Sequence, residues 1–156
     1  MDQIKEQIQL QMKRAMHDLV KEIAHKPSPS NADVDWFGRL VGELCERLIG
    51  LTPSRRDLHD SLLRQVDIGL MQQMFRHNAF DKQDVTTVSE VFIIRMAMLC
   101  APCQDADVIR ARSNIRECET GADAFVEMIT SLNSILDETV RLNEEFRATT
   151  DTPPSS

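Results

Sequence analysis

The chain has 156 residues, of which 42% are hydrophobic and 28% charged, a length and balance typical of one globular domain. The aromatic content of 4% and the scarcity of clustered β-branched residues disfavour a sheet-rich fold. The net charge of −7 arises entirely within residues 117–156, which carry nine acidic and two basic residues, and this distribution argues against a nucleic-acid-binding protein.

The N-terminal residues do not resemble an export signal, because Asp2, Lys5 and Glu6 introduce charges where an apolar segment would be needed. The most apolar run, 88–103, contains Arg95 and is too short to cross a bilayer. The four cysteines form no repeating framework, which is typical of reduced thiols. We therefore expect a cytoplasmic protein without a membrane span.

Residues 1–25 are predicted to form an amphipathic N-terminal helix. Its apolar residues recur every three or four positions: Ile4, Ile8, Met12, Ala15, Leu19 and Ile23. Two prolines and two serines in residues 26–33 end this helix and predict a linker. A helical domain is expected over residues 34–148, followed by a disordered tail over 149–156.

Five further helices are predicted from apolar spacing and from capping signals. Their expected ranges are 33 or 35 to 50, 53–75 with a kink near Gly69, 88–99 after a capping box of Thr87 and Glu90, 105–115, and 121–147. The chain is therefore predicted to be all-α, a bundle of about five to six helices in a single domain with a disordered C-terminal tail.

The segment 88–99 is apolar on nearly every side apart from Arg95 and is predicted to be the most buried helix. Gly38 and Gly42 are four residues apart and would let a neighbouring helix approach closely. Ten residues are expected to pack together in the core: Trp36, Leu40, Leu44, Leu62, Val91, Ile94, Leu99, Phe125, Leu132 and Leu136.

The motif Cys100-Ala-Pro-Cys103 could be a redox dithiol or half of a zinc site. Cys100 is expected at a helix C-terminus, where the helix dipole raises a thiol pKa, whereas a redox thiol needs a lowered pKa. A structural zinc site needs four ligands, and the other cysteines and histidines form no second pair. No phosphate loop, nucleophile elbow or metalloprotease helix occurs. We therefore expect structural thiols and predict no catalytic residue, cofactor or metal ligand.

Four segments in a fixed order resemble the T-complex protein 11 family: Leu48–Leu58 (LIGLTPSRRDL), Val66–Gln73 (VDIGLMQQ), Arg76–Asp81 (RHNAFD) and Met98–Val108 (MLCAPCQDADV). The family pattern reads like HGAFD in the third segment and LCAPVRDEEV in the fourth. Cys103 stands where the family usually has valine, which weakens the dithiol interpretation. Asn78 stands where the family usually has glycine, and both residue types tolerate a left-handed backbone. The resemblance covers roughly residues 36–147.

This resemblance implies a helical, cytoplasmic regulator without enzymatic activity or cofactor. Family members are linked to cAMP–protein kinase A signalling and, in animals, to sperm function. The chain lacks the family's usual second half, so we expect a compact member or a fragment.

The function expected first is that of a non-enzymatic regulatory or adaptor protein. The alternatives are a structural subunit of a cytoskeletal, axonemal or particle assembly, and a redox protein acting through Cys100 and Cys103. The predicted interaction surface combines apolar residues near both chain ends with two basic residues: Ile4, Ile8, Met12, Leu142, Phe146, Arg110 and Arg112. A protein partner is expected, either a second copy of the chain in a homodimer or another protein. In the competing arrangement the first helix folds back on the last, covers the apolar stripe and leaves a monomer.

Overall fold

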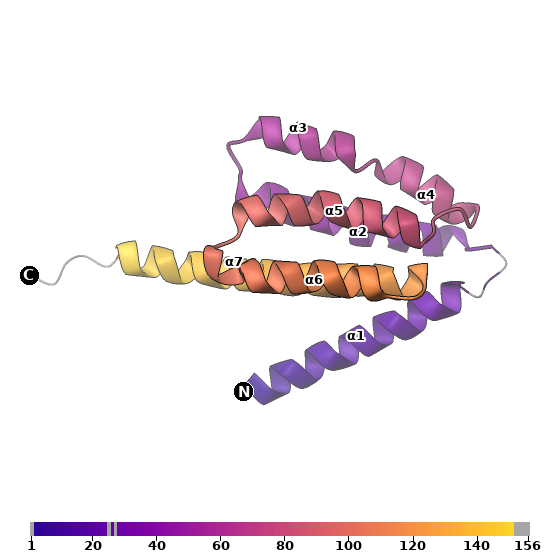
Figure 1. Ribbon diagram of the computed structural model, residues 1–156, viewed down its shortest axis with the longest axis horizontal. Helices are drawn as coiled ribbons and strands as arrows, with labels where there is room; N and C mark the ends of the chain where they lie inside the picture. The colour runs from indigo at the N-terminus through magenta and orange to yellow at the C-terminus, as the bar shows by residue number, and fades with distance from the viewer. Residues whose placement is uncertain (1, 25, 27, 152–156) are drawn as a thin grey trace, which may run out of the picture.

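The computed structural model describes residues 2–24, 26 and 28–151, which form seven α-helices and one short 3-10 helix and contain no strand (Figure 1). The predicted all-α bundle is confirmed. The predicted helix 53–75 is divided in two, which adds one helix to the expected number. The elements are α1 (Asp2–Ala24), α2 (Asn31–Leu51), α3 (Arg56–Gln65), α4 (Ile68–Arg76), α5 (Lys82–Leu99), η1 (Pro102–Gln104), α6 (Asp105–Glu117) and α7 (Gly121–Asp151).

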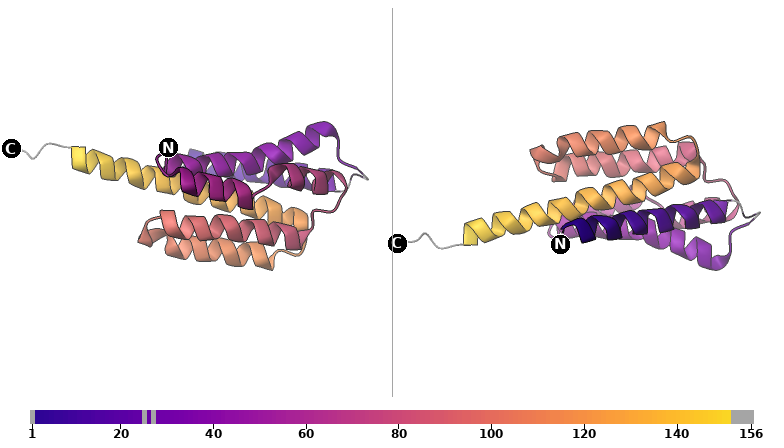
Figure 2. Two further views of the ribbon diagram at one scale, coloured as in Figure 1. Left: turned by 90° about the horizontal axis from the view of Figure 1, so that it is seen from above. Right: turned by 90° about the horizontal axis from the view of Figure 1, so that it is seen from below.

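The central helix of the bundle is α7, which packs against α1, α2, α5 and α6. The α3–α4 segment contacts α2 on one side of the molecule, and α1 lies on the opposite side (Figure 1). Figure 2 shows α1 and α7 side by side, with the C-terminal end of α7 extending beyond the other helices. Spacings of three and four residues put most of the buried apolar side chains of α7 on one face: Ala124, Phe125, Met128, Ile129, Leu132, Ile135 and Leu136.

The prediction that the segment 88–99 is the most buried helix is wrong. α5 buries Phe92 and Met96, but Ile94 is 58% exposed and Met98 is 66% exposed. A helix that is apolar on all sides carries no signal for which side faces water, so its solvent-facing side could not be identified.

Nine of the ten residues predicted in the core do lie in it or against it, Ile94 being the exception. Five are buried: Leu44, Leu62, Phe125, Leu132 and Leu136. Four are partly buried and pack against the core: Trp36, Leu40, Val91 and Leu99.

α2 begins earlier than the sequence predicted. Ser30 is its N-cap, because Ser30 Oγ accepts a hydrogen bond from the Asp33 amide at 3.2 Å and Asp33 Oδ2 accepts one from the Ser30 amide at 2.9 Å. This reciprocal capping box satisfies two amides at the start of the helix. The helix continues through Gly50, the predicted stop, to Leu51.

α5 also begins earlier, at a capping box that sequence reasoning missed. Asp81 and Asp84 each accept a hydrogen bond from the other's amide at 3.0 Å. Thr87, the predicted cap, lies inside the helix and its hydroxyl donates to the Gln83 carbonyl at 2.9 Å. The spacing of a capping box therefore occurs twice here, and only the first copy starts a helix.

The α3–α4 segment breaks near Val66 rather than kinking at Gly69. Asp67 caps α4, because its Oδ1 accepts a hydrogen bond from the Leu70 amide at 3.0 Å. α3 begins at Arg56, three residues after the predicted start at residue 53.

The predicted close helix approach occurs at Gly38. A Cβ atom at this position would lie 2.2 Å from Nε2 of Gln72 on α4, and that amide donates to the Val34 carbonyl at 3.1 Å. A larger residue would displace Gln72 from this bond. At Gly42 the nearest atom would be Ile68 Cδ1 at 3.6 Å, an ordinary contact.

The expectation for the turn after α4 is confirmed. Asn78, after α4, has a φ of 55°, in the left-handed region expected there. Thr120 caps α7, with its Oγ1 accepting from the Asp123 amide at 3.1 Å. α7 continues to Asp151, so the first residues of the predicted tail are helical, and 152–156 lie outside the described residues. Within the described residues, no helix has the length and apolar character needed to cross a membrane.

Candidate functional site

A cavity of about 330 Å³ lies at the end of the bundle where α1 leads into α2. Its walls come from the last turns of α1, the linker, the start of α2, the turn after α4, and the first turns of α5 and α7. We call it the aromatic cavity, because five of its lining residues are aromatic: Trp36, Phe37, Phe75, Phe80 and Phe125.

The phenylalanine rings form one packed wall around Phe37. The Phe37 ring stacks on Phe75 with centroids 4.4 Å apart and on Phe125 at 5.0 Å, and it meets Phe80 edge-on at 5.2 Å. Such ring pairs contribute roughly 0.5–1.5 kcal/mol each beyond the burial of their area. This wall of the cavity is therefore held in place by the protein's own packing.

Polar groups lie among the aromatic lining. Lys26 Nζ lies 3.1 Å from Asp33 Oδ2, and Asn78 and Gly121 also line the cavity. The pKa of Asp33 is lowered, chiefly by the hydrogen bond from the Ser30 amide and further by Lys26. The carboxylate form of Asp33 is thus stabilised next to the cavity.

Sequence reasoning did not identify this cavity. The aromatic content of 4% gave no indication of an aromatic cluster, yet four of the six phenylalanines come together here. They lie at helix ends, with Phe37 near the start of α2, Phe75 at the end of α4 and Phe125 near the start of α7. Successive long helices alternate in direction, so these helix ends meet at one end of the bundle. Phenylalanines that lie near alternate helix ends in the sequence could therefore have been predicted to come together.

The predicted interaction surface is divided among three helices. On α1, the apolar side chains near the N-terminus face solvent, with exposed fractions of 60% for Ile4, 50% for Ile8 and 65% for Met12. We call these three residues the α1 stripe. The C-terminal half of α1 is anchored instead, because Val20 and Ile23 are buried.

α1 is also fixed to α7 by an ion pair and a hydrogen bond. Lys13 Nζ lies 3.4 Å from Glu127 Oε2, and His17 Nε2 lies 2.9 Å from Asp123 Oδ1. The bond to His17 lowers the pKa of Asp123. The first helix thus folds back on the last, while the α1 stripe stays exposed and diverges from the bundle (Figure 1).

The two C-terminal members of the predicted surface lie on the projecting end of α7 (Figure 2). Leu142 is half-buried and Phe146 is 70% exposed. The C-terminal end of α7 extends beyond the N-terminal end of α1 (Figure 2).

The basic residues Arg110 and Arg112 lie on α6 and are engaged within the chain. Arg110 pairs with Asp107 at 3.3 Å, and Arg112 pairs with Glu90 on α5 at 2.7 Å. Arg116 also reaches Glu90 at 3.0 Å. The two pairs with Glu90 join α6 to α5, whereas the pair of Arg110 lies within α6. Both basic residues of the predicted interaction surface therefore have acidic partners within the chain.

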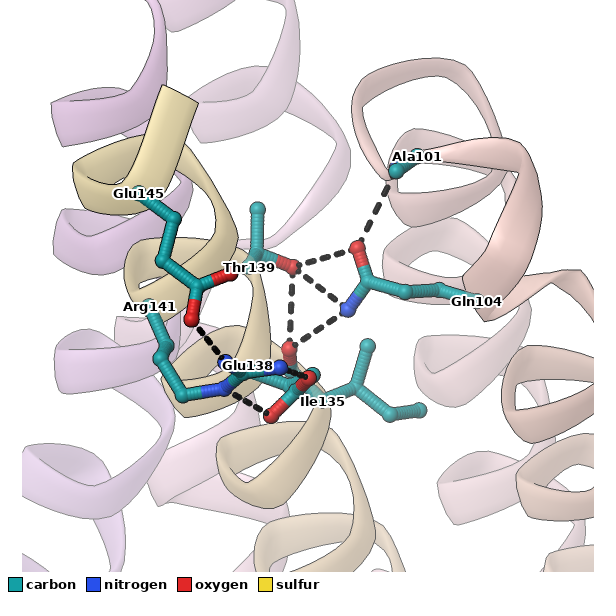
Figure 3. Close-up of polar contacts among 7 residues, drawn as sticks. All are labelled: Ala101, Gln104, Ile135, Glu138, Thr139, Arg141 and Glu145. Carbon is teal, nitrogen blue, oxygen red and sulfur yellow. Dashed lines mark hydrogen bonds and ion pairs between the residues drawn. The ribbon is translucent and has the colours of Figure 1, made fainter. Parts of the chain in front are cut away.

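The MLCAPCQDADV segment forms a buried polar junction between the α5–α6 turn and α7 (Figure 3). Gln104 Nε2 donates to the Ile135 carbonyl at 3.1 Å and to Thr139 Oγ1 at 3.0 Å. Gln104 Oε1 accepts from the Ala101 amide at 3.1 Å. Gln104 and Thr139 are both 2% exposed, so this part of the motif has a structural role.

On the exposed side of the same helix, Arg141 bridges Glu138 and Glu145 (Figure 3). These pairs join successive turns of α7, and water and salt screen such exposed pairs, so they contribute little to stability.

Three of the four cysteine thiols, those of Cys45, Cys100 and Cys118, have raised pKa values. Burial raises the pKa of the Cys100 thiol, in the direction expected, although a hydrogen bond with Thr139 opposes the shift. Burial also raises the pKa of Cys45 to about 11, and that of Cys118 rises for the same reason. Thiols with raised pKa values are poor nucleophiles at neutral pH. Among the described residues, no three metal-ligating side chains come together.

The sequence pattern that defines the T-complex protein 11 family matches residues 1–138 of the 156. The chain belongs to the T-complex protein 11 family. The match begins at residue 1 and therefore includes α1 and the linker, which lie outside the four segments that resemble the family. The family is not a known enzyme family. No solved structure matches the chain.

Proposed function

We propose that this T-complex protein 11 family member is a non-enzymatic regulatory or adaptor protein that acts by binding other proteins. The observation that carries the proposal is the α1 stripe, in which three large apolar side chains at spacings of four residues are at least half exposed. Helices with anchors at this spacing commonly dock into an apolar groove of a partner.

The way α1 is held supports this role. Its C-terminal half is anchored by Val20, Ile23 and the hydrogen bond of His17 with Asp123, which fixes the direction of the helix. Its N-terminal half presents the stripe at a distance from the core. A partner therefore meets a preformed helix and does not have to order a flexible segment, which would weaken binding.

The signalling pathway and the type of partner are also proposed here. The family resemblance supports cAMP–protein kinase A signalling in the cytoplasm, with a protein partner and no nucleic acid. A homodimer through the α1 stripe is the simplest assembly, because a two-fold interface uses the same patch twice. A structural subunit would instead assemble into larger, open-ended particles.

The test compares Ile8→Glu, which places a charge in the middle of the α1 stripe, with Gln7→Glu, which places the same charge on the neighbouring face. Both positions are exposed, so both variants should fold. Sedimentation equilibrium at micromolar concentration measures self-association. Binding to purified regulatory and catalytic subunits of protein kinase A tests the pathway.

We expect Ile8→Glu, and not Gln7→Glu, to weaken association at least tenfold. Equal behaviour of the two variants would remove the α1 stripe from the interface. Absence of binding to either kinase subunit would refute the pathway, and high-order particles would favour the structural alternative.

A further inference from the structure

The aromatic cavity has the properties of a small-molecule site. Its volume of about 330 Å³ lies within the range of roughly 300–1,000 Å³ found for ligand pockets. At about 30 Å³ for a group the size of a water molecule, it holds about eleven such groups. We propose that it binds a small amphipathic acid with an apolar body of about ten to twelve heavy atoms and one anionic end.

The apolar body is matched by the cavity wall. Phe37 fixes the positions of Phe75, Phe80 and Phe125 through its ring contacts, so the wall exists before a ligand arrives. Val20 and Ile23 on α1 add aliphatic side chains to the lining. Burying an acyl chain or an aromatic body here removes apolar surface of both ligand and protein from water.

The anionic end is matched by Lys26, the one charged residue among the described lining residues. Its ammonium has three donors, and the structure uses one of them on Asp33 at 3.1 Å. Gly121 and Ala122, the first two residues of α7, also line the cavity. The first amides of a helix have no acceptor within the helix and carry its positive dipole end. A carboxylate placed between Lys26 and the start of α7 would meet both.

The surroundings of Lys26 limit how much more tightly the cavity should bind an anionic than a neutral ligand. Asp33 already neutralises part of its charge, and the ammonium is partly open to water. We therefore expect an anionic end to strengthen binding about threefold to tenfold over a neutral end.

Trp36 gives a direct measurement. It lines the cavity, it is the only tryptophan in the chain, and there is no tyrosine, so tryptophan emission reports on this site alone. The full chain is titrated with decanoate, decanol and decylammonium below their aggregation concentrations. Isothermal calorimetry gives the stoichiometry.

Ala122→Leu fills the cavity from α7, and Ala97→Leu makes the same change on the exposed side of α5. Lys26→Gln removes the charge at the cavity, and Lys5→Gln removes one from an exposed position near the start of α1. Circular dichroism and urea unfolding establish that each variant is folded. Lys26 lies in the linker outside the helices, so its variant still tests the proposal if Ala122→Leu does not fold.

We expect saturable binding of one decanoate, stronger than decanol and decylammonium. Ala122→Leu should weaken it at least tenfold, and Lys26→Gln should reduce the preference for decanoate over decanol to the part that the start of α7 provides, while Ala97→Leu and Lys5→Gln behave like the unmodified chain. The proposal is overturned if millimolar decanoate gives no saturable change, if decanol binds as tightly as decanoate, or if the cavity-filling variant binds normally.

Discussion

The junction of Gln104 with Thr139 allows a quantitative test of the packing of the α5–α6 turn against α7 (Figure 3). The perturbations are Gln104→Leu, Thr139→Val and the two together. Both side chains are buried, and no buried polar side-chain atom in the described residues lacks a hydrogen-bond partner. Each single substitution therefore removes bonds from a fully satisfied network.

The expected losses in unfolding free energy follow from the hydrogen bonds that each substitution removes. Gln104→Leu removes the bonds to Ile135 and Thr139 and leaves the Ala101 amide without its acceptor, while the leucine recovers part of the loss by apolar burial. We expect a loss of about 1–3 kcal/mol. Thr139→Val leaves one hydrogen of the Gln104 amide unpaired in a buried site and should cost about 1–2 kcal/mol.

The double variant is the decisive measurement. With both polar side chains replaced, neither leaves the other unsatisfied, and the Ile135 carbonyl keeps its bond within the helix. The double variant should be about 1–2 kcal/mol more stable than the sum of the single losses predicts. Urea unfolding followed by circular dichroism and by Trp36 emission measures all three variants.

The matched control is Thr130→Val on the same helix. The Thr130 hydroxyl donates to the Val126 carbonyl at 2.8 Å, within its own helix, and so it links no other element. Its replacement should change the stability by less than about 0.5 kcal/mol. Additive losses within about 0.3 kcal/mol for Gln104 and Thr139 would refute the coupled network.

Three further predictions concern the core, the thiols and the start of α2. Leu132→Ala, at a fully buried position, should cost about 2–5 kcal/mol in urea unfolding and Ile94→Ala less than about 1 kcal/mol, and similar losses would contradict the assignment of the core. Cys103→Val should leave folding and partner binding unchanged, and stoichiometric metal in the purified protein would contradict the structural role of the thiols. Cys45, with its pKa raised to about 11, should react with a thiol reagent at pH 8 only after unfolding, and fast labelling of Cys45 in the folded protein would contradict its burial. Because the pKa of Asp33 is lowered from 3.8, its stabilising contribution should be complete above pH 3.8 and lost as the pH falls through the lowered value. The difference in unfolding free energy between the unmodified chain and Asp33→Asn should therefore shrink on acidification, and a difference that grows would contradict the prediction.

Helix existence and most of the core could be predicted from the sequence, because both depend on apolar spacing along one helix. The stripe of α7 from Phe125 to Leu136 is buried as its spacing predicted. Near residue 140 the same spacing continues, yet Val140 and Phe146 are exposed. Burial there requires a neighbouring helix, and α7 extends beyond the others at that end (Figure 2).

Helix starts were less predictable, since capping signals occur more often than helices do. Thr87 and Glu90 have the spacing of a capping box, but Asp81 and Asp84 start the helix six residues earlier. The cavity was less predictable again. Its wall depends on which helix ends meet, and no local pattern around Phe37 or Phe125 contains that information.

The resemblance that identifies the family is explained by structural roles. Cys100 follows the end of α5, the Ala101 amide bonds to Gln104, and Gln104 joins this turn to α7. Asn78, in another matching segment, provides the left-handed residue after α4. These residues determine how the helices are connected, and a fold alone does not determine a function. We therefore propose to test the function of this chain first at the α1 stripe, where three apolar side chains face solvent, and at the aromatic cavity.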